Sequence, residues 1–196
     1  MPPPPRLPLP FPLPRAALRA LVVLALLWTA AGVRADVIAV RSAELRIEEG
    51  DVLLSAQFEA QLTPPLDEAL SKGIPLYFMV EFELTRPRWY WVDEKVAQWS
   101  ITYRVSYNEL TRQYRVANGP LAGTTFDTLE DVQRFVGRVS SRPVARAEQL
   151  VKSARYEAAI RMRLDATQLP KPFQVNAMTS HEWQLDSGVH RWSFTP

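Results

Sequence analysis

Four stretches of the chain alternate apolar and polar residues with a period of two, and this pattern constrains the fold more than any other feature. In a β-strand successive side chains point to opposite faces, so each stretch predicts a strand with one buried and one solvated face. Such strands are typical of antiparallel sheets rather than of the wholly apolar strands in a parallel α/β core. The four stretches are 52–62, 76–84, 99–107 and 156–164.

Two short helices are expected between the strands. The first extends from Thr63 to Gly73, with Thr63 as its N-terminal cap, prolines in its first turn and Gly73 at its end. The second extends from about Thr128 to Val139, and Thr128 forms a capping-box pattern with Asp131. Pro143 prevents this helix from continuing much further.

The remaining segments complete a mainly β organisation. The turn at 49–51 predicts a hairpin that pairs a strand at 41–48 with the one that follows. Residues 169–172 form a proline-stiffened corner, and short strands are expected around 183–185 and 189–194. We therefore expect an antiparallel β-sandwich or open barrel with two short helices, as a single domain over residues 36–196.

The first 35 residues have a different character from the rest. Residues 1–19 contain three arginines, no acidic residue and a proline-rich run, and residues 20–31 are uncharged and apolar. A membrane-spanning helix needs about 20 apolar residues, so this stretch is short for an anchor. Small residues at Val33 and Ala35 fit the pattern that signal peptidase accepts. We expect a signal peptide that is cleaved after Ala35 and a periplasmic domain; an inner-membrane protein with an uncleaved anchor is the alternative.

Charge and residue content exclude several classes of function. The chain has a net charge of +2, but residues 1–35 hold four of its 23 basic residues and none of its 21 acidic ones, so residues 36–196 carry −2. A nucleic-acid-binding protein would keep a basic surplus, and we expect no nucleic-acid partner. There is no cysteine, and the only histidines are His181 and His190. We therefore expect no metal site and no cofactor.

Catalytic motifs are equally scarce. The sequence has no Gly-x-Ser-x-Gly elbow, no phosphate-binding glycine loop and no dinucleotide fingerprint. Two close carboxylate pairs, Glu81 with Glu83 and Asp93 with Glu94, could divide acid and base roles in a hydrolase. A solvated outer face explains these pairs more simply, and we expect no enzymatic activity.

The cluster of arginines and aromatic residues at 86–91 has two interpretations. In the first, which we favour from sequence alone, the large rings plug or seal the core and the arginines stack over ring edges. In the second, the cluster is a surface platform that binds a glycan or a protein partner, because Trp, Tyr and Arg are enriched at binding hot spots. The candidate binding residues are Arg86, Arg88, Trp89, Tyr90 and Trp91.

Charge is segregated along the chain. Residues 36–70 hold eight acidic and two basic side chains, whereas residues 134–163 hold eight basic and two acidic ones. Either the two segments face each other and neutralise internally, which we favour, or the basic segment contacts anionic lipid headgroups or an acidic partner.

Three blocks of the sequence are similar to one known family. They are residues 73–91, residues 103–116, and residues 164–175 taken with 182–187. Together they resemble a family of exported proteobacterial proteins known only as domain of unknown function 4390. The resemblance implies a location beyond the inner membrane and brings no catalytic residues. It also implies a gene neighbourhood with a nitrogen-regulation-type sensor histidine kinase, which suggests a shared pathway.

The residues and the resemblance together lead to one expected function. We expect an exported, non-enzymatic accessory or interaction protein that is linked to a membrane sensor histidine kinase pathway through a periplasmic or inner-membrane protein partner. A periplasmic module that binds glycan or peptidoglycan through the 86–91 cluster is the alternative. A hydrolase that uses an acidic pair is the third hypothesis.

Overall fold

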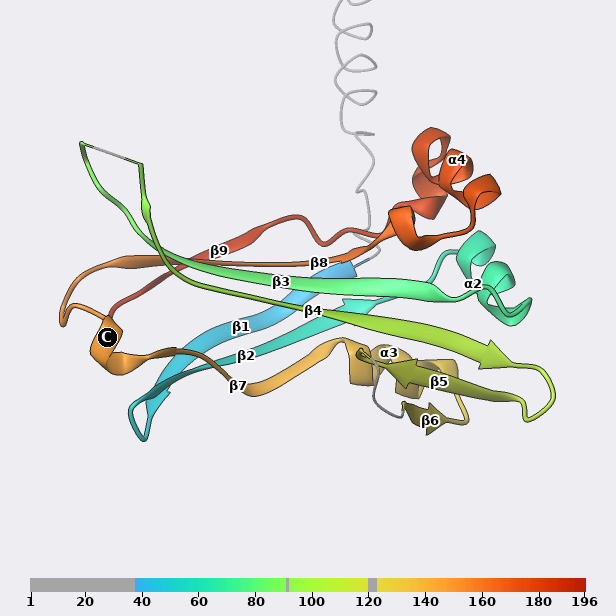
Figure 1. Ribbon diagram of the computed structural model, residues 1–196, viewed down its shortest axis with the longest axis horizontal. Coiled ribbons are helices and arrows are strands. Elements are labelled where there is room, and N and C mark those ends of the chain that lie inside the picture. The colour runs from blue at the N-terminus through green and yellow to red at the C-terminus, as the bar shows by residue number, and fades with distance from the viewer. Residues whose placement is uncertain (1–37, 91, 120–122) are drawn as a thin grey trace, which may run out of the picture. The chain divides into compact units, whose positions relative to one another are not determined.

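The strands form two separate antiparallel sheets (Figure 1). The computed structural model describes residues 38–90, 92–119 and 123–196. The small sheet has the strand order β1-β2-β7, and the large sheet has the order β6-β5-β4-β3-β8-β9. Neither sheet closes into a barrel. With two separate antiparallel sheets the fold is mainly β and sandwich-like, as expected. The bounds are β1 Ile38–Glu48, β2 Asp51–Ala60, β3 Leu76–Arg86, β4 Glu94–Asn108, β5 Gln113–Ala117, β6 Thr124–Phe126, β7 Arg138–Arg146, β8 Tyr156–Leu164 and β9 His190–Phe194.

The alternating stretches form the strands that they predicted. Strands β2, β3 and β8 bury every second residue over most of their length. β3 lies between β4 and β8, so that Phe82 is opposite Trp99 on one side and Ile160 on the other. The inward side chains of both sheets form one apolar core, in which Phe82 is only 1% exposed. Because removing such a ring from water stabilises the fold by about 1.5–3 kcal/mol, burial of the inward side chains stabilises the packing of the two sheets.

The β1–β2 hairpin is also confirmed, and its turn has a specific backbone requirement. Glu48 pairs with Asp51, and the two residues between them, Glu49 and Gly50, have φ values of 52° and 86°. Two-residue turns with positive φ at both positions match the right-handed twist of the flanking strands. Gly50 supplies this conformation without steric cost.

Both predicted helices are present, with two differences in detail. Helix α2 spans Pro64–Ser71 and α3 spans Leu129–Val136. Thr128 caps α3 as expected, accepting a hydrogen bond from the Asp131 amide at 3.2 Å. Thr63 does not cap α2 with its side chain; its hydroxyl instead donates to the carbonyl of Glu182 at 2.5 Å and ties α2 to the C-terminal part. Helix α3 ends at Val136 rather than at Val139, because the chain turns into β7 immediately after Gly137.

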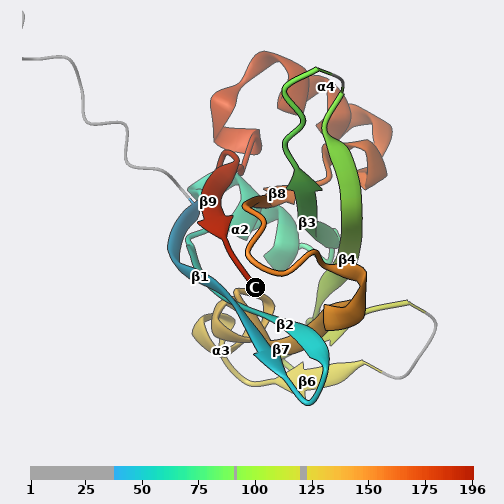
Figure 2. The ribbon, with the colours of Figure 1, turned by 90° about the vertical axis from the view of Figure 1, so that its left-hand side faces the viewer.

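Two further elements correct the sequence-based expectations. The segment after Gly137 forms the strand β7, which pairs with β2. The corner at 169–172 is the start of a third helix, α4, over Lys171–Thr179, with Pro172 in its first turn. No strand forms around 183–185; residues 181–183 make a short 3₁₀ helix instead, whereas the expected strand near 189–194 is β9. Helices α2 and α4 lie together, away from α3 (Figures 1 and 2).

The predicted signal peptide, residues 1–35, lies outside the described residues. Among the helices of the described ranges, none combines the length and the apolar character that a membrane span requires.

Candidate functional site

The turn between β3 and β4 projects away from the sheets, and we call its described residues, 87–90 and 92–93, the hairpin tip. Figure 1 shows this turn rising clear of the neighbouring strands. Pairing between β3 and β4 continues as far as Arg86 and Glu94, with a register shift between Leu84 and Thr85. Such a bulge increases the local twist and bends the hairpin away from the sheet. The strands therefore present the tip outward on a paired stem.

The aromatic side chains described in the tip are exposed rather than buried. Trp89 is 94% exposed, and Tyr90 and Val92 are 66% and 79% exposed. The rings of Trp89 and Tyr90 meet edge to face, with centroids 5.1 Å apart and planes at 73°. The interpretation that these rings plug the core is therefore wrong for Trp89 and Tyr90. Trp91 lies outside the described residues.

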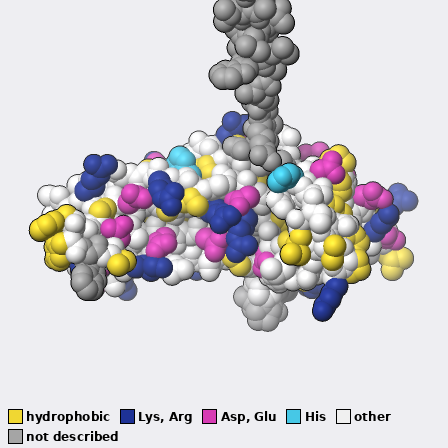
Figure 3. Space-filling view, turned by 90° about the horizontal axis from the view of Figure 1, so that it is seen from above, with side chains coloured by type: hydrophobic (Ala, Val, Ile, Leu, Met, Phe, Trp, Pro, Cys, Tyr) yellow, Lys and Arg dark blue, Asp and Glu magenta, His cyan; other side chains and the backbone are white. Residues whose placement is uncertain are grey.

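Hydrophobic side chains gather at the hairpin tip in the space-filling view. In Figure 3 they cover the left-hand end, where Figure 1 places the β3–β4 turn. Val92 is a further exposed apolar residue of the same turn. Val92 was not among the candidate residues expected from sequence, although its position directly after the aromatic run is the signal that points to it.

The arginines of the cluster hold the base of the tip. Arg86 and Arg88 both form ion pairs with the carboxylate of Glu94, the second at 2.6 Å. These hydrogen bonds, first of all the one from Arg88, lower the pKa of the Glu94 carboxyl. The Arg88 amide also donates to Asp93 Oδ1 at 3.2 Å. The arginines thus bind carboxylates across the stem instead of stacking over the rings. Glu94, expected from sequence only as a member of an acidic pair, therefore belongs to this site.

The carboxylates of the pair Glu81 and Glu83 are held by separate cations. Glu81 binds Arg163 at 3.0 Å, and Glu83 binds Lys95 at 2.9 Å, so each carboxylate is directed to a different cation. They line a shallow hollow of about 200 Å³ on the outer face of the large sheet. Figure 3 shows acidic and basic side chains intermixed on the face it presents. This mixture is the solvated charged surface that the simpler interpretation predicts.

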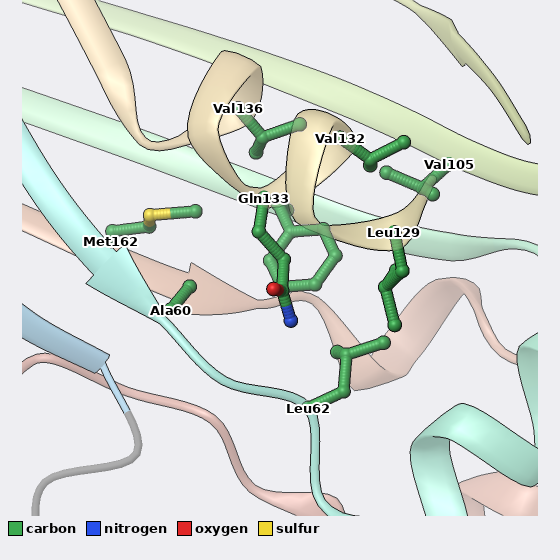
Figure 4. A pocket seen from close by; sticks show the side chains of 9 residues that line it. Ala60, Leu62, Val105, Leu129, Val132, Gln133, Val136 and Met162 are labelled. Atoms are coloured by element: carbon green, nitrogen blue, oxygen red, sulfur yellow. The ribbon is translucent and has the colours of Figure 1, made fainter. Parts of the chain in front are cut away.

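The interior offers no room for a ligand of ordinary size at the cavity under α3. Nine residues line this cavity, and eight of them are labelled in Figure 4. Its volume is about 10 Å³, which is about the space of one water molecule. Leu62, Val132 and Val136 are among the apolar residues around it, and Gln133 is its one polar lining residue. This cavity is a packing defect of the core.

The two oppositely charged segments neutralise each other only in part. Arg146 of β7 lies 3.5 Å from Asp51 of β2, which joins the two segments. Arg161 and Arg163, however, bind Asp186 and Glu81, which lie outside the acidic segment. Arg138 and Arg142 form no ion pair with another residue that the structure describes. The favoured interpretation, internal neutralisation, is therefore incomplete.

Metal-binding geometry is lacking in the part of the chain that the structure describes. No three or more His, Asp or Glu side chains converge there into a group that could hold an ion. His181 instead contacts the side chain of Gln184 at 3.3 Å.

Comparison with known proteins gives one match. A family model described as "Domain of unknown function (DUF4390)" matches residues 35–193. No curated protein matches the chain. No solved structure matches it either.

Proposed function

Because the chain belongs to the DUF4390 family, a domain of unknown function, we propose its role from the site itself: an exported, non-enzymatic interaction protein that contacts a protein partner through the hairpin tip. The observation that carries the proposal is the exposure of Trp89, which leaves nearly all of its surface in water. A tryptophan ring that stays in water contributes little to the stability of the fold. Its burial against a partner would recover a large apolar area, and tryptophan and tyrosine are the residues most enriched at binding hot spots.

The stem makes the tip a prepared binding element. Glu94 forms ion pairs with both Arg86 and Arg88, so that the last residue of β3 and the start of β4 are held together. A contact loop that is ordered before binding loses less conformational entropy on association. The proposed partner therefore meets an exposed apolar projection on a braced stem.

A protein partner fits this projection better than a glycan. A platform for a sugar chain needs coplanar aromatic rings, whereas Trp89 and Tyr90 meet at 73° and form an edge-to-face wedge. A wedge fits into the apolar groove of a protein. The extracytoplasmic segment of the sensor kinase that the family resemblance implies is the first partner to test.

The other parts of the proposal rest on sequence and charge. Export is supported by the basic, apolar and small-residue pattern of residues 1–35. A non-enzymatic role is supported by the separate ion pairs of Glu81 and Glu83.

Photo-crosslinking tests the proposed contact. A benzophenone amino acid replaces Tyr90 in the full chain, and Trp89→Ala is introduced in a second copy of that variant. The matched control places the same crosslinker at Leu110, which is 96% exposed in the turn between β4 and β5. After illumination of cells, crosslinked products are identified by mass spectrometry.

We expect a discrete protein adduct from position 90 that weakens with Trp89→Ala and does not form from position 110. Identification of the neighbouring sensor kinase in the adduct would support the kinase version. Equal labelling from both positions would overturn the tip as contact site. If no protein adduct forms and the purified domain instead sediments with peptidoglycan in a way that requires Trp89, the tip binds a glycan and not a protein.

A further inference from the structure

A second surface hollow lies on a different part of the molecule from the hairpin tip, where α3 meets β6 and β7 (Figure 1). Its volume is about 430 Å³, which lies within the range of about 300–1,000 Å³ typical of binding sites. We call it the α3–β7 hollow. Its lining residues are Tyr103, Phe126, Asp131, Arg134, Phe135, Arg138 and Ser140.

The floor of the α3–β7 hollow is aromatic. Phe135 packs edge to face on Tyr103, with ring centroids 6.1 Å apart, and its ring lies 5.1 Å from that of Phe126. Tyr103 is buried, while Phe135 of α3 stays 42% exposed. An exposed aromatic ring on a fixed helix, supported from below by two others, is a preformed apolar contact for a ligand.

The rim of the hollow is cationic. Arg134 binds Asp131 at 3.0 Å, and this carboxylate also accepts the Thr128 hydroxyl at 2.8 Å. The exposed guanidinium of Arg138 has no ion-pair partner among the described residues. Arg142, two positions further along the same edge strand from Ser140, stacks over the Trp99 ring at 5.6 Å. Among the residues that line the hollow, two arginines and one carboxylate give the rim a positive balance, which favours an anionic ligand.

The hollow continues into a second, polar one, which gives the surface an elongated form. A hollow of about 270 Å³ lies along β7, and Arg138 and Ser140 line both hollows. It is rich in hydroxyl groups, with Ser42, Ser55 and Ser141 among its lining residues. An open, elongated surface fits an extended chain better than a compact small molecule, which needs most of its own surface enclosed.

The edge of β7 itself is protected against pairing with another strand. Its register shifts opposite Leu54 and Ala56, Ser141 has a φ of 45°, and Pro143 lacks an amide donor. Bulges, proline and charged side chains are the features that prevent edge strands from pairing. A ligand at this place is therefore bound by side chains.

We propose that the α3–β7 hollow binds an acidic peptide segment of a protein partner, with an apolar side chain of the segment on Phe135 and a carboxylate on Arg138. This site is independent of the hairpin tip, and either can fail without the other. Apolar contact supplies affinity, and the cationic rim supplies the preference for acidic segments.

Fluorescence anisotropy with defined probes tests this site. The probes are fluorescein-labelled hexapeptides that alternate phenylalanine with glutamate or with lysine, titrated with the purified chain. The test variant is Arg138→Glu. Its matched control is Arg104→Glu, an arginine on β4 that is also exposed and points to the face opposite to its neighbour Tyr103. Circular dichroism checks that both variants fold.

We expect the glutamate probe to bind at least about tenfold more tightly than the lysine probe, and this preference to weaken as salt rises. Arg138→Glu should weaken the glutamate probe by about tenfold, and Arg104→Glu should leave it unchanged. Equal binding of the two probes, equal loss in both variants, or no binding of the glutamate probe would overturn the proposal. Binding to anionic phosphatidylglycerol vesicles that depends on Arg138, without peptide binding, would assign the hollow to lipid headgroups instead.

Discussion

The backbones of Phe58 and Gly137 lie in direct contact, with the Phe58 amide donating to the Gly137 carbonyl at 2.7 Å. Gly137 joins α3 to β7 at the point where β2 passes beneath it. A Cβ atom at position 137 would collide with the carbonyl oxygen of Phe58. The absence of a side chain is therefore what lets the helix and the small sheet approach.

Gly137→Ala should destabilise the fold by about 2 kcal/mol, because crowding of a packed site costs about 1–3 kcal/mol. Urea denaturation of the purified domain measures this loss. Gly188→Ala is the control, since a Cβ at Gly188 meets no neighbour and carries only the strain of a φ of 64°. That strain costs about 1–2 kcal/mol, so a smaller loss at Gly137 than at Gly188 would contradict the close-contact argument.

Trp89→Ala should leave the stability of the domain unchanged within about 0.5 kcal/mol, because the ring contacts little of the fold. Phe82→Ala, at a position that is 1% exposed, should cost about 3–5 kcal/mol. Thermal or urea unfolding of both variants gives the comparison. A loss at Trp89 that approaches the one at Phe82 would restore the core interpretation and remove the tip as a binding element.

Glu94→Gln should loosen the stem of the hairpin tip, because Arg86 and Arg88 both lose their shared carboxylate. We expect faster hydrogen exchange at the amides of residues 86–94 and unchanged exchange in β8, measured by mass spectrometry. Glu83→Gln is a suitable control, since it removes one ion pair, with Lys95, from the same two strands. Unchanged exchange in Glu94→Gln would mean that backbone pairing alone holds the stem.

A strand could be predicted from the sequence only where its own residues alternate between apolar and polar. β2, β3 and β8 carry their alternation in the sequence itself, so each could be placed without its partner. β7 could not, because the bulge at Ser141 and the proline at 143 interrupt its alternation. Its strand conformation comes from pairing with β2, which is distant in the sequence.

Helix α4 was missed for a related reason. It buries only Ala177, while Val175 and Met178 remain exposed, so it lacks the apolar stripe that indicated α3. Pro172 was interpreted as part of a corner, although proline is equally common in the first turn of a helix.

The candidate site shows a different limit of sequence reasoning. The residue types at 86–91 identified the cluster, but large aromatic residues are usually buried, and that tendency favoured the wrong location for Trp89. Trp89 is exposed because the pairing of β3 with β4 ends at Arg86 and Glu94, before the chain reaches the ring. Phe135 and Arg138 were likewise not singled out as partners, because α3, β4, β6 and β7 meet only in the folded chain.

Asp165 should make the stability of the fold depend on pH in the acidic range. Burial by itself raises the pKa of the Asp165 carboxyl. Hydrogen bonds from Gln168 and Thr167, together with the charge of Arg163, lower the pKa by more than burial raises it, so the pKa lies below its ordinary value. A carboxyl with a depressed folded-state pKa stabilises the protein above its unfolded pKa of about 4, and this contribution is lost as the pH falls through the folded-state value. Stability should therefore decrease below about pH 4.

Asp165→Asn isolates this contribution. At neutral pH it should cost about 1–3 kcal/mol, because an amide cannot accept all the hydrogen bonds that Thr167 and Gln168 donate. The difference in free energy of unfolding between Asp165→Asn and the unaltered protein should become smaller as the pH is lowered toward about 3. Urea denaturation across that pH range measures it. The exposed Asp127, which accepts one hydrogen bond from Gln113, is the control, and Asp127→Asn should cost less than about 0.5 kcal/mol. A constant difference between Asp165→Asn and the unaltered protein at every pH would show that the charge of Asp165 does not stabilise the fold.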